Sequence, residues 1–170
     1  MNKGNKLDVA PSVFTREFNA PRQLVFDAWT QTDHLINWMF PQAGYKCEYV
    51  RADIKTGGSS LHKMTSPQGH EMWLLTKYEE VISPDTIVFR QYNSNAKGDI
   101  VPNRQMPDWP REMRATVLLK EQKGKTNLQL IWQPMEVTQA ELDSFEASRS
   151  QHVNGWGSGF DQLSIYLKTI

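Results

Sequence analysis

Two stretches near opposite ends of the chain decide its fold: FNAPRQLVFDAWT at residues 18–30 and HVNGWGSGFDQLSIYL at residues 152–167. In the first, a short alternating strand leads through Pro21 into a helix, because the fixed φ of proline suits a first helical turn. A second short helix follows it. In the second stretch, apolar residues at helical spacing form one stripe: Val153, Trp156, Phe160, Leu163 and Leu167.

The sequence between these stretches is rich in strands. Apolar and polar residues alternate in runs that short turns separate, and short connections favour antiparallel pairing. The fold class predicted is therefore α+β, with a curved antiparallel sheet wrapped around a long C-terminal helix and two short helices closing a cavity. The predicted sheet runs cover residues 12–19, 45–54, 60–66, 70–82, 86–92, 112–121 and 125–133.

Two terminal segments frame a single domain. Residues 1–11 are polar and predict a flexible tail, and residues 12–170 are predicted to form one domain. Thr138 and Glu141 have capping-box spacing, so they open a helix that we expect to run to about Lys168. Three glycines in this helix lower its stability, and they either kink it or let a strand approach closely: Gly155, Gly157 and Gly159.

One connection is unusually long for a compact domain. Residues 93–110 contain three prolines and show no clear periodicity. Loops of this length are either surface excursions or lids and binding loops. Met106 and Trp109 favour a lid, because a fully solvated loop has little use for them.

Composition excludes several classes of partner. Lysine plus arginine number 19, as do aspartate plus glutamate, so the formal net charge is zero and nothing attracts nucleic acid or an anionic membrane. Cys47 is the single cysteine, which fits a reducing compartment. No apolar run has the length of a signal peptide or a membrane span. The sequence predicts a cytoplasmic protein without nucleic-acid or membrane partners, as a monomer or a homodimer.

Four motifs in order resemble the START-like (SRPBCC) superfamily, and within it the small homologues of the activator of the ninety-kilodalton heat-shock chaperone ATPase. The motifs are APRQLVFDAW at residues 20–29, HLINW at 34–38, DIKTGG at 53–58 and GW at 155–156. The resemblance covers about residues 12–168. It implies a helix-grip fold with a deep cavity between the sheet and the C-terminal helix. It does not imply one function, since relatives include lipid carriers, cyclases and co-chaperones.

The chain departs from the usual family pattern around that cavity. Trp38-Met39-Phe40 stands where relatives commonly carry two tryptophans. Ser60 and His62 occupy inward positions that are often aromatic, and the loop at residues 93–110 is longer than expected.

The alternation of residues along the strands predicts which side chains line the cavity. Side chains two residues apart on a strand share a face. The predicted face is mainly apolar with a few isolated polar side chains, which is typical of small-molecule sites. The same residues also suit an ordinary core, and His62 is either a ligand-orienting or proton-moving group or a satisfied core histidine. The predicted ligand-binding residues are His62, Met72, Leu74, Thr76, Tyr78, Phe89, Gln91, Met113, Ala115, Val117, Leu130, Trp132, Trp156 and Phe160.

Three functions are compatible with this reading. The first is binding of an apolar or aromatic small molecule between the sheet and the C-terminal helix. The second is a co-chaperone-like module that stimulates a heat-shock chaperone ATPase. The third is a cyclase or hydrolase, for which His62, Tyr78 and Asp27 are loose candidates. The sequence assigns no catalytic residue, no cofactor and no metal, since the four histidines lack metal-ligand spacing.

Overall fold

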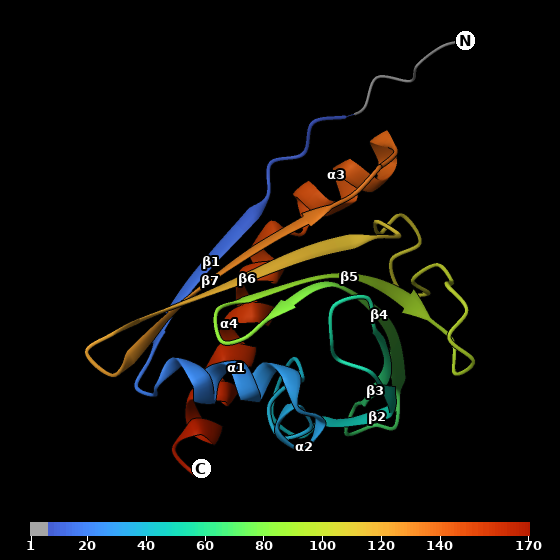
Figure 1. Cartoon of the computed structure of the whole chain (residues 1–170). Helices are drawn as coiled ribbons and strands as arrows, with labels where there is room; N and C mark the ends of the chain where they lie inside the picture. The colour runs from blue at the N-terminus through green and yellow to red at the C-terminus, as the bar shows by residue number, and fades with distance from the viewer. Residues whose placement is uncertain (1–6) are drawn as a thin grey trace.

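A single antiparallel sheet forms the body of the molecule and curves around the C-terminal helix (Figure 1). The computed structural model describes residues 7–170. Its seven strands lie in the order β1-β7-β6-β5-β4-β3-β2. This confirms the predicted α+β helix-grip fold. The strands are β1 (Ser12–Phe18), β2 (Lys46–Ala52), β3 (Ser59–Thr65), β4 (Glu71–Ile82), β5 (Thr86–Ser94), β6 (Met113–Gln122) and β7 (Lys125–Pro134).

In residues 7–170, four helices accompany the sheet: α1 (Arg22–Thr30), α2 (Thr32–Leu35), α3 (Gln139–Ala147) and α4 (Arg149–Leu167). Of the short pair, α1 lies against β6 and β7, and α2 lies beside β2 (Figure 1). The capping box is confirmed, because Thr138 Oγ1 accepts from the Glu141 amide at 3.2 Å and Glu141 Oε2 accepts from the Thr138 amide at 2.8 Å.

The prediction of one uninterrupted C-terminal helix is wrong, because the helix breaks at Ser148. Ser148 has φ −103° and ψ 9°, outside helical geometry. Its Oγ donates to the Ser144 carbonyl oxygen at 2.8 Å and lies 2.9 Å from His152 Nε2. A serine side chain that bonds to nearby backbone competes with the helical ladder. Across the break, the rings of Phe145 and His152 lie 4.8 Å apart, so tertiary packing fixes the bend.

The three glycines of α4 do not cause this break. The helix continues without interruption from Arg149 to Leu167. A methyl group placed on any of these glycines would meet no described atom within 4 Å, apart from the neighbouring backbone of the helix itself. The expectation of a closely approaching strand is therefore wrong, and a kink at these glycines stays a prediction.

Packing between α4 and the sheet is strongest on the β1–β7 side. The Phe160 ring meets Phe18 edge to face at 6.2 Å, and the Trp156 ring lies 6.5 Å from that of Phe14 and 5.9 Å from that of Trp132. Edge-to-face aromatic pairs add to the energy of simple area burial. On the other side of α4, the ring of Trp29 from α1 stacks on Trp156 at 6.2 Å. The long helix is thus held between β1 and α1.

The N-terminal tail prediction falls partly on residues 1–6, which lie outside the described residues. Within the described part, the Ala10 carbonyl oxygen accepts a hydrogen bond from Arg149 Nη2 at 2.7 Å. Flexibility of the tail stays a prediction. No helix in residues 7–170 is both long enough and apolar enough to cross a membrane.

A tight turn joins β2 to β3 and pins both to β4. The Gly57 amide donates to the Tyr78 carbonyl oxygen at 3.0 Å, and the Tyr78 amide donates to the Gly58 carbonyl oxygen at 2.9 Å. A Cβ on Gly58 would lie 2.0 Å from the Asp53 carbonyl oxygen, whereas real Cβ atoms do not approach backbone this closely. Glycine is therefore required at position 58.

We predict that Gly58→Ala lowers the free energy of unfolding by about 2 kcal/mol, because the added methyl group overpacks the turn. The control is Gly155→Ala on the open surface of α4, which should raise stability by about 0.5–1 kcal/mol through helix propensity. Urea unfolding followed by circular dichroism measures both. Equal midpoints for Gly58→Ala and the wild type would contradict the steric argument.

Candidate functional site

One face of the sheet gathers all the strand residues that the sequence predicted as cavity lining. Residues paired directly across antiparallel strands project to the same side, and the register places Tyr78 opposite Phe89, Phe89 opposite Ala115 and Ala115 opposite Trp132. His62 pairs with Leu74 on the same side. We call this side, which faces α4, the inner face.

The predicted residues differ in how deeply the fold buries them. Met72 is 37% exposed and Leu74 and Gln91 are half-buried, so they lie toward the rim of the inner face. Trp132 and Trp156 are also half-buried. The buried members are His62, Thr76, Tyr78, Phe89, Met113, Ala115, Val117, Leu130 and Phe160. The structure therefore brings these residues onto one surface, and ligand contact by them stays a prediction.

Two hydrogen-bonded pairs engage four polar side chains of the inner face. Ser60 Oγ lies 3.1 Å from the Tyr78 hydroxyl, and Gln91 Nε2 donates to Thr76 Oγ1 at 3.3 Å. Burial raises the pKa of Tyr78 to about 12, so its hydroxyl stays protonated. Each pair joins neighbouring strands, so these groups are satisfied within the sheet.

His62 differs from these groups. It is 2% exposed, and its Nδ1 has no hydrogen-bond partner in the described part of the chain. The Tyr49 ring stacks on the imidazole at 4.8 Å with an interplanar angle of 23°. Burial lowers the pKa of His62 to about 4, so the ring is neutral near pH 7. The expectation of a satisfied core histidine is therefore wrong, because a buried ring nitrogen is left without a partner.

The sequence-based lining missed Tyr49 and Trp29. Tyr49 pairs with His62 on the inner face, and the alternation of Cys47 with Tyr49 along β2 carried the signal. Trp29 projects from α1 toward α4, and its buried indole Nε1 has no partner among the described residues. Helical spacing placed Trp29 in the core without indicating that it faces α4.

Gly159 marks unfilled space beside α4. Its position is buried, yet a Cβ there would meet no described atom within 4 Å beyond the local helix. Successive residues of an α-helix are rotated by about 100°, so Gly159 and Tyr166, seven positions apart, project in nearly the same direction. The Tyr166 hydroxyl lies 2.6 Å from His34 Nδ1 of α2. The space therefore lies on the α1–α2 side of the helix, away from the β1 contacts.

The long loop between β5 and β6 is anchored on the two C-terminal helices. The Trp109 ring lies 5.2 Å from His152, 5.9 Å from Trp132 and 6.1 Å from Phe145. The expectation of a loose surface excursion is therefore wrong. Because Trp132 belongs to the inner face, the loop closes one end of it, as the lid hypothesis requires.

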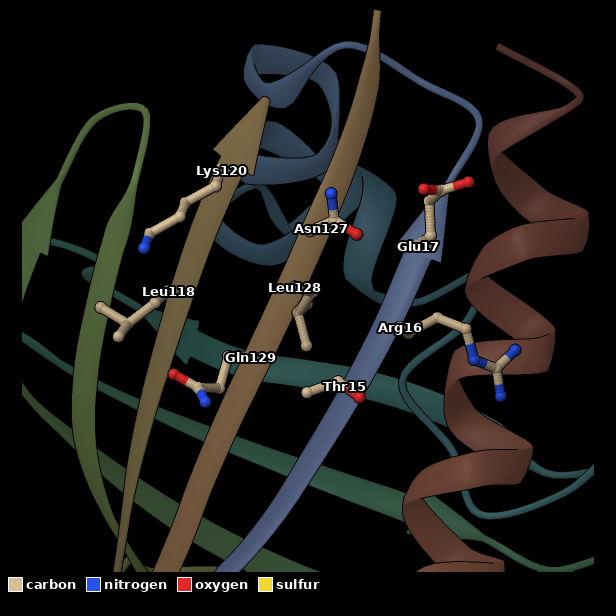
Figure 2. Close-up of a pocket in the computed structure, with 8 residues that line it drawn as sticks. All are labelled: Thr15, Arg16, Glu17, Leu118, Lys120, Asn127, Leu128 and Gln129. Carbon is tan, nitrogen blue, oxygen red and sulfur yellow. The ribbon is translucent and has the colours of Figure 1, made fainter. Parts of the chain in front are cut away.

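Two surface hollows occur in the described part of the chain. The larger, of about 340 Å³, opens on the outer side of β1, β7 and β6, where Thr15, Gln129 and Leu118 lie side by side (Figure 2). The smaller, of about 200 Å³, separates the β5–β6 loop from the start of α3. Neither is lined by any of the predicted ligand-binding residues.

The three acid–base candidates do not form a catalytic unit. Asp27 accepts a hydrogen bond from Gln23 on its own helix, and Tyr78 is paired with Ser60. No hydrogen bond joins any two of His62, Tyr78 and Asp27, all of which lie in the described part of the chain. Within residues 7–170, no group of three or more His, Cys, Asp or Glu side chains is arranged to hold a metal ion.

A curved sheet gripping a C-terminal helix, with an inner face closed by short helices, defines a START-like protein. The chain belongs to the family described as activator of Hsp90 ATPase homolog 1-like protein, whose family model matches residues 19–168. The resemblance inferred from the sequence motifs is thereby confirmed. Family and fold together suggest a ligand-binding domain. A comparison with curated proteins finds no match.

Solved bacterial structures share the fold over nearly the whole chain. A protein from Staphylococcus epidermidis is similar with 25% identity and a TM-score of 0.76, covering 96% of this chain and 92% of that one. A protein from Arthrobacter aurescens has 18% identity and a TM-score of 0.79, covering 95% and 88%. An AHSA1 protein from Silicibacter pomeroyi has 17% identity and a TM-score of 0.71, covering 94% and 99%.

We predict that stability falls as the pH drops from 6.5 to about 4, in part because of His62. The unfolded ring takes up a proton near pH 6.5 while the folded ring does not, so acid favours unfolding. The contribution of His62 is about 1.4 kcal/mol per pH unit across this window. His62→Phe removes this titration. Its free energy of unfolding, measured in urea at several pH values, should depend less steeply on pH. Parallel pH profiles would contradict a neutral buried His62.

We also predict that Trp109→Ala releases the β5–β6 loop. The loss of three aromatic contacts should lower stability by about 2 kcal/mol, less than for a fully buried tryptophan. Amide hydrogen exchange should rise across residues 102–112 and leave β6 protected. Met106→Ala, at a half-buried position in the same loop, is the control and should change exchange much less. Unchanged exchange in Trp109→Ala would show that Trp109 does not anchor the loop.

Proposed function

We propose that the chain binds an apolar or aromatic small molecule between the inner face of the sheet and α4. The observation that carries this proposal is the unfilled space beside the buried Gly159. Protein interiors are normally packed without voids, so a buried helix position with no neighbour across from it is unusual. An apolar molecule of modest size would restore the missing contacts.

The walls around this space have the character of a ligand site. The rings of Trp29 and Trp156, the latter three residues before Gly159 on α4, stack on each other and offer flat apolar surfaces. The opposite wall is the inner face, where apolar residues surround a few polar groups. Sites for small molecules combine such walls with isolated polar groups that fix the orientation. The indole Nε1 of Trp29 and the imidazole of His62 are unsatisfied groups of this kind.

The β5–β6 loop supplies a route of entry. Trp109 closes the inner face at its Trp132 end by aromatic contact alone, without a backbone hydrogen bond from Trp109 to α4 in the described structure. Contacts of this type break and reform readily in lid movements. We infer that the loop opens to admit the ligand and closes over it, which makes the loop a lid.

A second candidate function follows from the family description, which names an activator of a chaperone ATPase. In this role the chain would stimulate a heat-shock chaperone. An ATPase assay with the chaperone from the same host tests it. Unchanged turnover at saturating protein would remove this candidate and leave ligand binding untouched. We place the protein in the cytoplasm under either function.

The test of the leading proposal fills the space beside α4. Gly159→Leu places an apolar side chain where the ligand would lie, and Gly155→Leu places the same side chain on the exposed surface of α4. Native mass spectrometry of protein purified gently from its own host should show an additional mass that disappears on denaturation. This mass should persist in Gly155→Leu and be lost in Gly159→Leu.

Both variants should be as stable as the wild type or more stable by about 0.5–1 kcal/mol, because leucine is a better helix former than glycine. Urea unfolding of both variants checks this, and loss of the bound mass counts only in a variant shown to be folded. An additional mass that persists in Gly159→Leu would contradict the proposed position. A wild-type protein without any bound mass, which also fails to bind added 2-methylnaphthalene, would overturn ligand binding.

A further inference from the structure

The inner face contains one polar side chain that the fold leaves unsatisfied. His62 lies between Tyr49, which stacks on its ring, and Leu74, its cross-strand neighbour. Its buried Nδ1 has no partner in residues 7–170. A buried polar group without a partner destabilises a protein. An incoming ligand that hydrogen-bonds to the ring would recover this energy.

The neighbouring polar groups are already engaged. The Tyr78 hydroxyl is paired with Ser60, and Thr76 is paired with Gln91. These pairs can keep their hydrogen bonds when a ligand enters, whereas His62 gains one. On this side of the pocket, His62 is therefore the group that distinguishes one ligand from another.

The charges around His62 favour a neutral ligand. Arg16, on the β1 part of the inner face, is already paired with Asp161 at 2.7 Å. Throughout β2, β3, β4 and β5, as described, the inward positions carry uncharged side chains. The acidic residue of α1, Asp27, is bonded to Gln23 on its own helix. Burial of a carboxylate without a cation is strongly unfavourable. Because burial lowers the pKa of His62 to about 4, the ring itself supplies no positive charge near neutral pH.

We propose that His62 recognises a hydroxyl group on a neutral, apolar ligand. A neutral imidazole has one nitrogen that donates and one that accepts. A hydroxyl group can donate to the unprotonated nitrogen or accept from the protonated one, so it suits either tautomer. The stacked Tyr49 ring holds the imidazole in place. This inference rests on the proposed function, because it requires a ligand on the inner face.

Three naphthalene probes test the inference at neutral pH: 2-naphthol, 2-methylnaphthalene and 2-naphthoate. They share one apolar body and differ in carrying a hydroxyl, a methyl or a carboxylate group. A net hydrogen bond of about 1 kcal/mol corresponds to about fivefold in affinity. Titration calorimetry should show 2-naphthol binding about fivefold more tightly than 2-methylnaphthalene, and 2-naphthoate binding most weakly.

The variant His62→Phe keeps an aromatic ring against Tyr49 and removes both ring nitrogens. It should bind 2-methylnaphthalene like the wild type and lose the preference for 2-naphthol. His70→Phe, at an exposed position, is the matched control and should keep that preference. If His62→Phe does not fold, the ¹⁵N resonances of His62 in the wild type give the answer, because they should move with 2-naphthol and not with 2-methylnaphthalene.

The outcomes separate this inference from the proposed function. Equal binding of 2-naphthol and 2-methylnaphthalene, or a hydroxyl preference that survives in His62→Phe, would overturn the role of His62 and leave ligand binding standing. Tightest binding by 2-naphthoate would overturn the restriction to neutral ligands. Failure of all three probes to bind would overturn both proposals.

Discussion

The structure depends on the packing of α4 against one side of a wide, curved sheet. Phe160 and Trp156 direct the helix toward Phe18 and Phe14 of β1. A seven-stranded sheet offers more inner surface than one helix can cover, so α1 and α2 cover the remainder. The space beside Gly159 lies where these two coverings meet. This space exists because one helix cannot cover the whole curved sheet and because residue 159 is a glycine.

This arrangement explains why the polar groups of the inner face fall into two classes. Groups near the middle of the sheet find partners on adjacent strands, as Tyr78 does with Ser60. Two buried nitrogens in the described residues have no partner: Nδ1 of His62, although β3 lies between β4 and β2, and Nε1 of Trp29 on α1. Interiors usually satisfy their polar atoms, and exceptions concentrate at sites of function. The ligand proposed here would lie between these two groups.

Much of the fold could be predicted from the sequence, because alternation fixes which strand residues share a face. The inner positions of β3 to β7 and the Thr138 capping box were both predictable on local grounds. The break at Ser148 was not, since it depends on Phe145 and His152 packing together with Trp109 from a distant loop. The candidate site was predicted less well. Alternation identified His62 as inward, but only the three-dimensional packing shows that its ring lacks a partner and that the space lies beside Gly159.

The most direct test of this account is a crystal structure of the protein under xenon pressure. Xenon enters apolar cavities that water leaves empty, and its scattering shows where the empty space lies. Xenon should appear beside Gly159, between α4, Trp29 and the inner face of the sheet. Crystals in which xenon occupies other sites and leaves this position empty would contradict the claim that the helix grip encloses a binding space.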